Sequence, residues 1–370
     1  MATDQLDNFL NASWPQPDHR PTSQGNTVAS IGKLVTEGRL GIAANLVRGD
    51  AKVLDMDNAL LASLKAKHPP GVAKPFGPTA GPIPGLSHSE DDILTAIHSF
   101  KPYTAHGFSG WTVPLLKIAI KGPKVVAMLT CLTGMIGQGT APGRSMLAAS
   151  RLTLLEKKDG GHRPIDVGDL IYRLCTKVLL RHHFKADCLL PTQFGVGSKG
   201  GVEPGVRTVQ RALDDSLGRS FSTLTMLDFT NAFNTADRID IAASLREFCP
   251  SLYRTAKWAY NAASDLVLGQ HILQSATGVR QGDPLGPLLL SLAIRPLLDR
   301  LSTFLGTDHL VLAYLDDVYV LSPTQDLASA SEFASTLEKI YFRTSTPYSF
   351  SGSVFNKTSA IFRGLSRITP

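Results

Sequence analysis

The sequence has few cysteines, few charged residues and no long hydrophobic run. Its four cysteines lie far apart in the sequence and form no Cys-x-x-Cys pair, which argues against a disulfide framework and against zinc. No apolar stretch approaches the roughly 20 residues that cross a bilayer. The amino-terminal segment lacks a basic region followed by an apolar one, so it does not resemble a secretory signal. We therefore expect an intracellular protein, nuclear or cytoplasmic, that is not secreted and has no membrane partner.

The remaining composition is that of a foldable, mildly basic chain. Hydrophobic residues make up 43% of its 370 residues, enough for a sizeable core, and the length allows about two or three domains or one large multi-lobed domain. This composition excludes a wholly disordered, collagen-like or low-complexity chain. The formal net charge of +6 favours a polyanionic partner, but only weakly.

Helical and strand-like patterns alternate along the chain without internal repeats. They predict an α+β fold with a mostly antiparallel sheet. The expected helices span residues 31–68, 89–99, 168–186, 203–217, 236–248, 285–305 and 328–341. The expected strands are three hairpins at residues 151–167, 264–276 and 309–322 and a single strand at 221–229.

Three carboxylates lie at the ends of apolar strands. Asp228 ends the strand LTMLD, and Asp316 and Asp317 lie between the strands LVLAYL and VYVLS. Adjacent carboxylates repel each other and are costly to bury, which a shared cation would relieve. Acids at the ends of neighbouring strands are typical ligands for hard divalent ions, and a pair of such ions catalyses phosphoryl transfer. The alternative is that the two adjacent acids are only a polar hairpin turn.

A glycine-rich segment, GVRQGDPL, lies between these acids at residues 278–285. Asp283 and Pro284 suit the N-cap and first position of the apolar helix that follows. Gly278 and Gly282 predict close approach of the backbone to a flat ligand. The alternative interpretation of this segment is a capped helix and nothing more.

Basic residues recur every four positions along the helix expected at 168–186. They are Arg173, Lys177, Arg181 and Lys185, and they lie opposite an apolar stripe. Either they form a solvated face or they follow the phosphates of a nucleic acid.

The order of these motifs resembles the reverse transcriptases of non-LTR (LINE-type) retrotransposons. TMLDFTNAF, GVRQGDPLGPLLL and AYLDD resemble the palm motifs of that family. LLEKKDGGHRPI resembles its fingers hairpin, TQFG the short motif after the hairpin, AHGFSGW the motif before it, and FNKT a compressed later palm motif. The resemblance covers about residues 38–364.

The resemblance implies a metal site at the strand-end acids. Asp228 and Asp316 would hold two Mg²⁺ ions, with Mn²⁺ as an alternative, assisted by Asp317 and the carbonyl of Phe229. In FNKT, Lys357 would protonate the leaving pyrophosphate. Tyr314 would lie near the primer end.

The resemblance also implies how nucleotide and nucleic acid are bound. Lys157 and Arg163 would hold the incoming triphosphate, and Gln281 and Gly282 would lie beside the nucleotide and template. Phe233 would exclude a ribose 2′-OH and so favour dNTPs. The partners would be an RNA template, a DNA primer and dNTPs, and the oligomeric state stays open.

The implied fold is a right-hand polymerase with fingers and palm, in which an antiparallel palm sheet packs on helices. We expect a disordered arm at residues 1–30, a helical extension at 31–100, fingers at 101–220 and a palm at 221–370, with the thumb missing or truncated because the chain stops soon after FNKT. Two other functions stay open. One is a weak or inactive remnant that binds nucleic acid, and the other is an RNA-dependent RNA polymerase, which Phe233 disfavours.

Overall fold

The computed structural model describes residues 58–71, 74–79, 88–156, 162–189, 193–197, 202–213, 221–229, 231–323 and 355–362. The chain divides into two compact units. The smaller unit comprises residues 1–54 and 155–163, and the larger unit comprises residues 55–154 and 164–370. All side-chain interactions described below lie within the larger unit.

Four helices of the larger unit pack together around an apolar cluster. They are α5 (Glu90–His98), α6 (Val113–Ala119), α7 (Val125–Gln138) and α9 (Leu170–His183), while α4 (Asn58–Lys67) and α8 (Arg144–Leu147) contribute no residue to it. α5 starts at a capping box, in which Ser89 and Asp92 bond each other's backbone N–H groups. Ile93 and Ile97 of α5 meet Leu174 and Val178 of α9 in the cluster. The apolar stripe predicted for α9 is therefore buried.

A first sheet has the strand order β2-β1-β4-β5. Its strands are β1 (Ser150–Glu156), β2 (His162–Gly168), β4 (Ser264–Leu268) and β5 (His271–Ser275). β4 and β5 form the expected antiparallel hairpin, whereas β1 pairs with β4 in parallel. The sheet therefore joins two hairpins that are distant in the sequence, which the strand patterns alone do not indicate.

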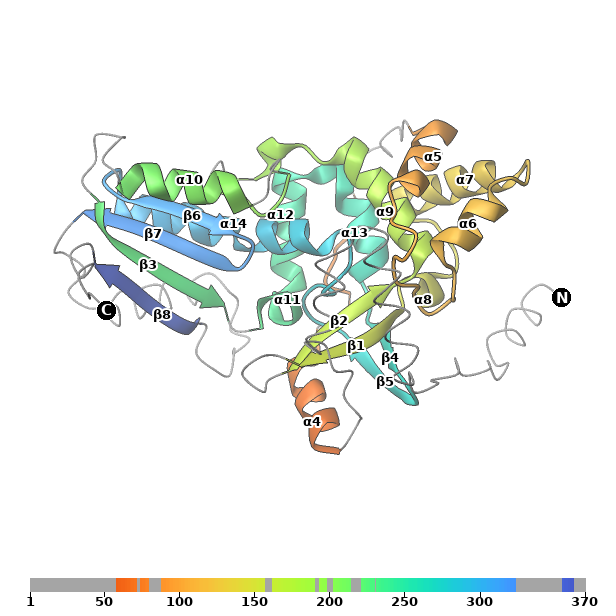
Figure 1. The fold of residues 1–370 in the computed structure, drawn as a ribbon, viewed down its shortest axis with the longest axis horizontal. Coiled ribbons are helices and arrows are strands. Elements are labelled where there is room, and N and C mark those ends of the chain that lie inside the picture. The colour runs from red at the N-terminus through yellow and green to blue at the C-terminus, as the bar shows by residue number, and fades with distance from the viewer. Residues whose placement is uncertain are drawn as a thin grey trace, which may run out of the picture. The chain divides into compact units, whose positions relative to one another are not determined.

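A second sheet has the strand order β6-β7-β3-β8 and is antiparallel throughout. Its strands are β3 (Phe221–Phe229), β6 (Leu310–Tyr314), β7 (Asp317–Pro323) and β8 (Phe355–Phe362). The predicted hairpin at 309–322 and the predicted single strand are thereby confirmed, and they pair with each other (Figure 1).

Helices cover both faces of this second sheet. Further helical segments are α10 (Val202–Leu213), α11 (Ala232–Thr235), α12 (Arg238–Phe248), α13 (Tyr253–Tyr260), α14 (Gly286–Leu305), η1 (Ala186–Cys188) and η2 (Pro250–Leu252). Val311, Val318 and Val320 face the main core with α12 and α14, whereas Leu312 and Leu321 pack against α10. β6 and β7 are therefore packed on both faces, whereas Met226 of β3 is 37% exposed.

Several predicted boundaries differ from the structure. α9 ends at His183, so Lys185 lies beyond the helix that was expected to carry it. α14 begins at Gly286, three residues after the proposed N-cap. The structure describes only 58–67 of the helix expected at 31–68, and the helix expected at 328–341 lies outside the described residues.

Two of the cysteines, distant in the sequence, meet in the fold. Cys188 and Cys249 are both buried in the main core, and all four cysteines are free thiols. Burial, together with the neighbouring Cys188, raises the pKa of Cys249 to about 12. Among the described residues no helix is long and apolar enough to cross a membrane.

Candidate active site

The two acidic strand ends lie side by side in the second sheet. Asp228 near the end of β3 is the register partner of Asp317 at the start of β7, and Tyr314 at the end of β6 pairs with Asp317 from the other side. Directly opposed residues of an antiparallel pair have Cα atoms about 4.5–5.5 Å apart. Leu315 and Asp316 form the turn between β6 and β7. The expectation that these acids meet on neighbouring strands is confirmed at the level of the backbone.

β8 brings the FNKT motif to the same strand end. Lys357 is the register partner of Asp228 on the opposite side of β3 from Asp317. The register shifts between Asp228 and Phe229, where the ladder passes to Phe355. Three motifs far apart in the sequence therefore share one end of a sheet.

The donor set at this end consists of oxygen ligands. Asp316 is half-buried and Asp317 is exposed, so carboxylate oxygens reach solvent there. Among the side chains that the structure describes, no three acidic, histidine or cysteine groups form a ready metal site, and the Asp228 side chain is not among them. Carboxylate and carbonyl oxygens are the donors that Mg²⁺ and Mn²⁺ prefer, so the residues present fit such an ion.

The segment at 278–285 is joined to the helix that follows Asp228. The Val279 N–H donates to the carbonyl of Phe233 at 2.6 Å, and the Gly278 N–H donates to the carbonyl of Ala236 at 2.9 Å. A Cβ at Gly278, whose φ is +61°, would lie 2.2 Å from the Phe233 carbonyl oxygen. The close approach predicted for this glycine therefore serves the protein's own backbone and not a flat ligand.

The same segment is clamped to β2 on its other side. The Gln281 N–H donates to Oδ2 of Asp166 at 2.8 Å, and the Asp166 N–H donates to the Gln281 carbonyl at 2.8 Å. A Cβ at Gly282 would lie 2.3 Å from the Asp166 carbonyl oxygen, so a glycine is required for this close approach to β2. Gln281 and Gly282 are thus held between two elements while Gly282 stays exposed.

Asp166 on β2 is a buried carboxylic acid. It is 2% exposed, and among the described residues Oδ1 has no hydrogen-bond partner. Burial raises the pKa of this carboxyl to about 6, although the charge of His68 opposes the shift. The clamp on Gln281 therefore contains a titratable group near neutral pH.

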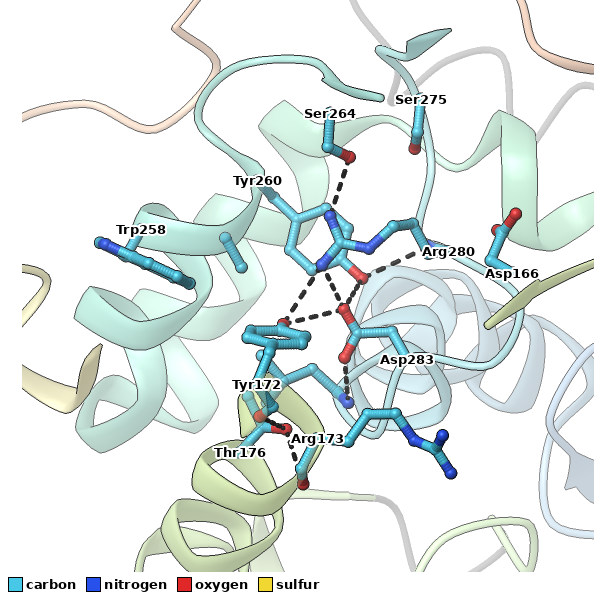
Figure 2. Close-up of polar contacts among 12 residues, drawn as sticks. Asp166, Tyr172, Arg173, Thr176, Trp258, Tyr260, Ser264, Ser275, Arg280 and Asp283 are labelled. Carbon is cyan, nitrogen blue, oxygen red and sulfur yellow. Dashed lines mark hydrogen bonds and ion pairs between the residues drawn. The ribbon is translucent and has the colours of Figure 1, made fainter. Parts of the chain in front are cut away.

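A buried ion pair lies at the centre of the segment. Arg280 donates to Oδ2 of Asp283 at 2.5 Å, and the two side chains are 2% and 1% exposed. Figure 2 shows the Arg280 guanidinium beside the rings of Tyr172 and Tyr260, whose hydroxyls donate to Asp283 at 2.9 and 2.7 Å. Ser264 accepts a further bond from Arg280 at 2.9 Å.

This pair corrects the role predicted for Asp283. Its Oδ1 accepts from the Leu285 N–H at 2.9 Å, but α14 starts only at Gly286. The other oxygen is consumed by Arg280 and the two tyrosines, so the carboxylate is mainly an ion-pair partner in the core and not a helix cap.

The residues of this buried cluster shift one another's pKa values. Burial alone would lower the pKa of Arg280, but Tyr260, Asp283 and Tyr172 raise it above its usual value. Burial and the nearby Asp283 raise the pKa of both tyrosines well above the usual value. Arg280 therefore stays charged and the phenols stay neutral donors, which satisfies the buried groups.

The basic residues predicted along α9 differ in environment. Arg173 and Lys177 are half-buried and lie over the ring of Phe100 at 5.8 and 4.6 Å. Arg173 also donates to the carbonyl of Ala105 at 2.9 Å. Arg181 and Lys185 are exposed. Arg173 and Lys177 therefore pack against neighbouring residues, whereas Arg181 and Lys185 face solvent.

The remaining predicted residues are described in part. Tyr314 and Phe233 are half-buried, Phe229 is buried and Arg163 is exposed on β2. Lys157 lies outside the described residues. Arg238 is buried and donates to the carbonyls of Gly278 and Ser275 at 2.8 and 2.9 Å. Asp166, Arg238 and the Arg280–Asp283 ion pair are the supporting residues that sequence reasoning missed.

Comparisons with known proteins agree with this arrangement. A family model described as "Reverse transcriptase (RNA-dependent DNA polymerase)" matches residues 155–343, just over half of the chain. The retrotransposable element SLACS 132 kDa protein of Trypanosoma brucei gambiense is 30% identical over 243 residues, which are 60% of this chain and 19% of the relative. The chain thus spans about a fifth of that relative's length. The family match includes Asp228, the 278–285 segment and Asp316, whereas Lys357 lies beyond it.

Removing one partner of the buried pair should destabilise the protein strongly. In Asp283→Ala the Arg280 charge stays buried without its counter-ion, so we expect a loss of about 3–5 kcal/mol in the free energy of unfolding. The matched control is Glu203→Ala, which breaks the exposed pair with Arg207 and should cost about 0–1 kcal/mol. Urea denaturation measures both. The double variant Arg280→Met/Asp283→Leu should be more stable than Asp283→Ala, and equal losses in Asp283→Ala and the control would contradict this account.

Asp166 should make stability depend on pH. Its pKa is about 6 in the folded protein against 3.8 for the ordinary carboxyl. Between these values the unfolded chain loses its proton while the folded chain keeps it, so wild-type stability falls relative to Asp166→Asn as pH rises from about 4 to 6. The total fall is about 3 kcal/mol, with no change above that range. Urea denaturation across pH 4–8 tests this, and a constant difference between the two proteins would contradict it.

Proposed function

Because the chain belongs to the reverse transcriptase (RNA-dependent DNA polymerase) family, of the non-LTR retrotransposon kind, we propose that it carries out template-directed DNA synthesis. A primer 3′-OH attacks the α-phosphorus of a dNTP, and pyrophosphate leaves. The observation that carries the proposal is the register of β3, which pairs Asp228 with Asp317, beside Asp316, on one side and with Lys357 on the other. RNA is the template and DNA the primer.

Asp228 and Asp316 are the residues proposed to hold two divalent metal ions. Phe229 contributes its carbonyl and Asp317 lies nearby. Magnesium ions, when bound there, stabilise the entering and leaving oxygens of the displacement. The antiparallel pairing supports this role, because it brings the backbone of Asp228 to the turn that contains Asp316. Lys357 acts as the proton donor to pyrophosphate, which its register opposite Asp228 supports.

The nucleotide lies against Phe233, Gln281 and Gly282 in this proposal. The hydrogen bond between Val279 and Phe233 supports it, since that bond ties the aromatic residue to the loop that contains the other two. Phe233 then limits space at the sugar 2′ position. Lys157 and Arg163 bind the triphosphate, and these two roles rest on the resemblance of their hairpin to the family's fingers motif.

The template and primer contact the exposed basic residues at the end of α9 and the turn between β6 and β7. Arg181 and Lys185 face solvent and suit phosphate contacts. Arg173 and Lys177 belong to the same basic row in this proposal, although their charged groups lie over the ring of Phe100. Tyr314 contacts the primer end, next to the turn that contains Asp316. Residues 101–220 correspond to fingers and 221–370 to the palm.

The two adjacent acids should not be equivalent. Asp316→Asn removes a ligand charge from both ions and should abolish magnesium-dependent extension of oligo(dT) on poly(rA), as should Asp228→Asn. Asp317→Asn should leave more residual activity. Each change in the adjacent pair removes a repelling charge, so neither variant should melt below wild type without metal. An Asp316→Asn protein as active as wild type would refute the polymerase assignment, and a wild-type chain without extension would favour an inactive remnant.

Phe233 should control the choice of sugar. Phe233→Val opens space beside the loop while its carbonyl bond to Val279 is retained, so we expect the preference for dNTP over rNTP to fall by about tenfold or more. Single-nucleotide incorporation with matched dNTP and rNTP measures the ratio. Phe248→Val is the control, because Phe248 also packs partly buried against the main core but lies in α12 beside Arg295. A ratio changed equally in both variants would contradict a steric gate.

A further inference from the structure

The turn before Asp316 has an unfavourable backbone conformation. Leu315 has φ = +56°, in the left-handed region that residues with a Cβ rarely adopt. It directly precedes Asp316 and follows Tyr314, the last residue of β6. The direction in which Asp316 leaves the turn depends on this conformation, so something must hold it.

The side chain of Gln193 bonds both polar groups of Leu315. Its Oε1 accepts from the Leu315 N–H at 2.9 Å, and its Nε2 donates to the Leu315 carbonyl at 3.5 Å. The same oxygen accepts from the Gly195 N–H at 3.0 Å. Gln193 is 6% exposed, so these bonds are shielded from water. A carboxamide carries the donor and the acceptor that one amino acid's backbone needs.

The backbone around Gln193 is fixed to the end of β6. Gln193 and Ala313 form a parallel bridge, and the Phe194 N–H donates to the Ala313 carbonyl at 2.8 Å. Phe194 packs in the small core beneath α10. A Cβ at Gly195 would lie 2.7 Å from the Leu315 nitrogen, so this glycine allows the segment to touch the turn. We call Gln193–Gly195 the strap.

We propose that the strap holds Leu315 in its left-handed conformation and that Gln193 is thereby a positioning residue for Asp316. Gln193 reaches no reacting atom in this role and acts through the turn. The effect on catalysis through Asp316 rests on the proposed polymerase function. The role of the strap in fixing the conformation of Leu315 rests on the observed contacts alone. It also assigns a physical task to the TQFG motif, which lies more than a hundred residues before the turn.

The first experiment removes the carboxamide while it keeps the length of the side chain. In Gln193→Met, the amides of the β6–β7 turn should exchange faster in hydrogen–deuterium exchange of the full chain, while exchange in α12 is unchanged. In primer extension, kcat should fall about ten- to a hundredfold, as expected when a reacting group moves by about 1 Å, and the KM for dNTP should change much less.

A rescue variant separates positioning from simple loss of stability. Glycine adopts positive φ without a steric cost, so Leu315→Gly in the Gln193→Met background should recover kcat several-fold. A merely structural role for Gln193 predicts no such rescue, since Leu315→Gly removes a further half-buried side chain. A double variant no better than Gln193→Met would overturn the proposed positioning.

A pair of glycine variants gives an independent test. Gly195→Ala should disturb the turn because its Cβ would overlap the Leu315 backbone, and it should lower kcat and speed turn exchange. Gly205→Ala in α10 is the matched control, because its Cβ would meet Phe194 at an ordinary 3.6 Å and does not contact the turn. It should leave both readouts at wild-type values.

The outcomes distinguish this inference from the polymerase proposal. If the wild-type chain extends no primer, the proposed function fails, whereas turn exchange still tests the strap. Unchanged turn exchange in both Gln193→Met and Gly195→Ala would overturn the strap, whatever the activity. Faster exchange with unchanged kcat would overturn the positioning of Asp316.

Discussion

The buried Arg280–Asp283 pair is the interaction on which the arrangement of the larger unit depends. Each charge is costly to bury alone, and the pair is satisfied only when α9, α13 and β4 supply Tyr172, Tyr260 and Ser264. The pair therefore requires the helices, the first sheet and the 278–285 segment to assemble together. The rest of that segment is then held between α11 and Asp166, so its exposed side has a defined position.

The second sheet contributes the other constraint, which is register. A one-residue slip in β7 would turn Val318 and Val320 from the main core toward α10, so burial on both faces of β7 fixes the pairing. The same pairing sets Asp228 opposite Asp317 and Lys357. The positions of these acids and of Lys357 thus follow from how the apolar core is packed. The turn at Leu315 connects the packed strands β6 and β7 to the proposed metal ligands.

Several predictions from the sequence were correct for local reasons. The strands and helices around the acids have strong periodic patterns, and the β6–β7 hairpin and the helix α5 depend on residues that are neighbours in the sequence. Other predictions were wrong because a distant partner competes with the local one. Asp283 precedes a proline and suits an N-cap, but Arg280 and two tyrosines take up most of its bonding capacity. Gly278 was predicted to approach a flat ligand, yet it is buried against the backbone of Phe233 and Asn234.

The sequence by itself determined the chemical groups and their order: three acids at strand ends, a glycine-rich loop between them, and the resemblance to reverse transcriptases that the family comparison bears out. These follow from residue type and spacing, which are local properties. The tertiary structure alone decided which residues from distant parts of the chain hold these groups in place. The clamp of Asp166 on Gln281, the parallel pairing of β1 with β4 and the bonds of Gln193 to Leu315 join residues far apart in the chain, and no periodicity within a segment encodes such contacts.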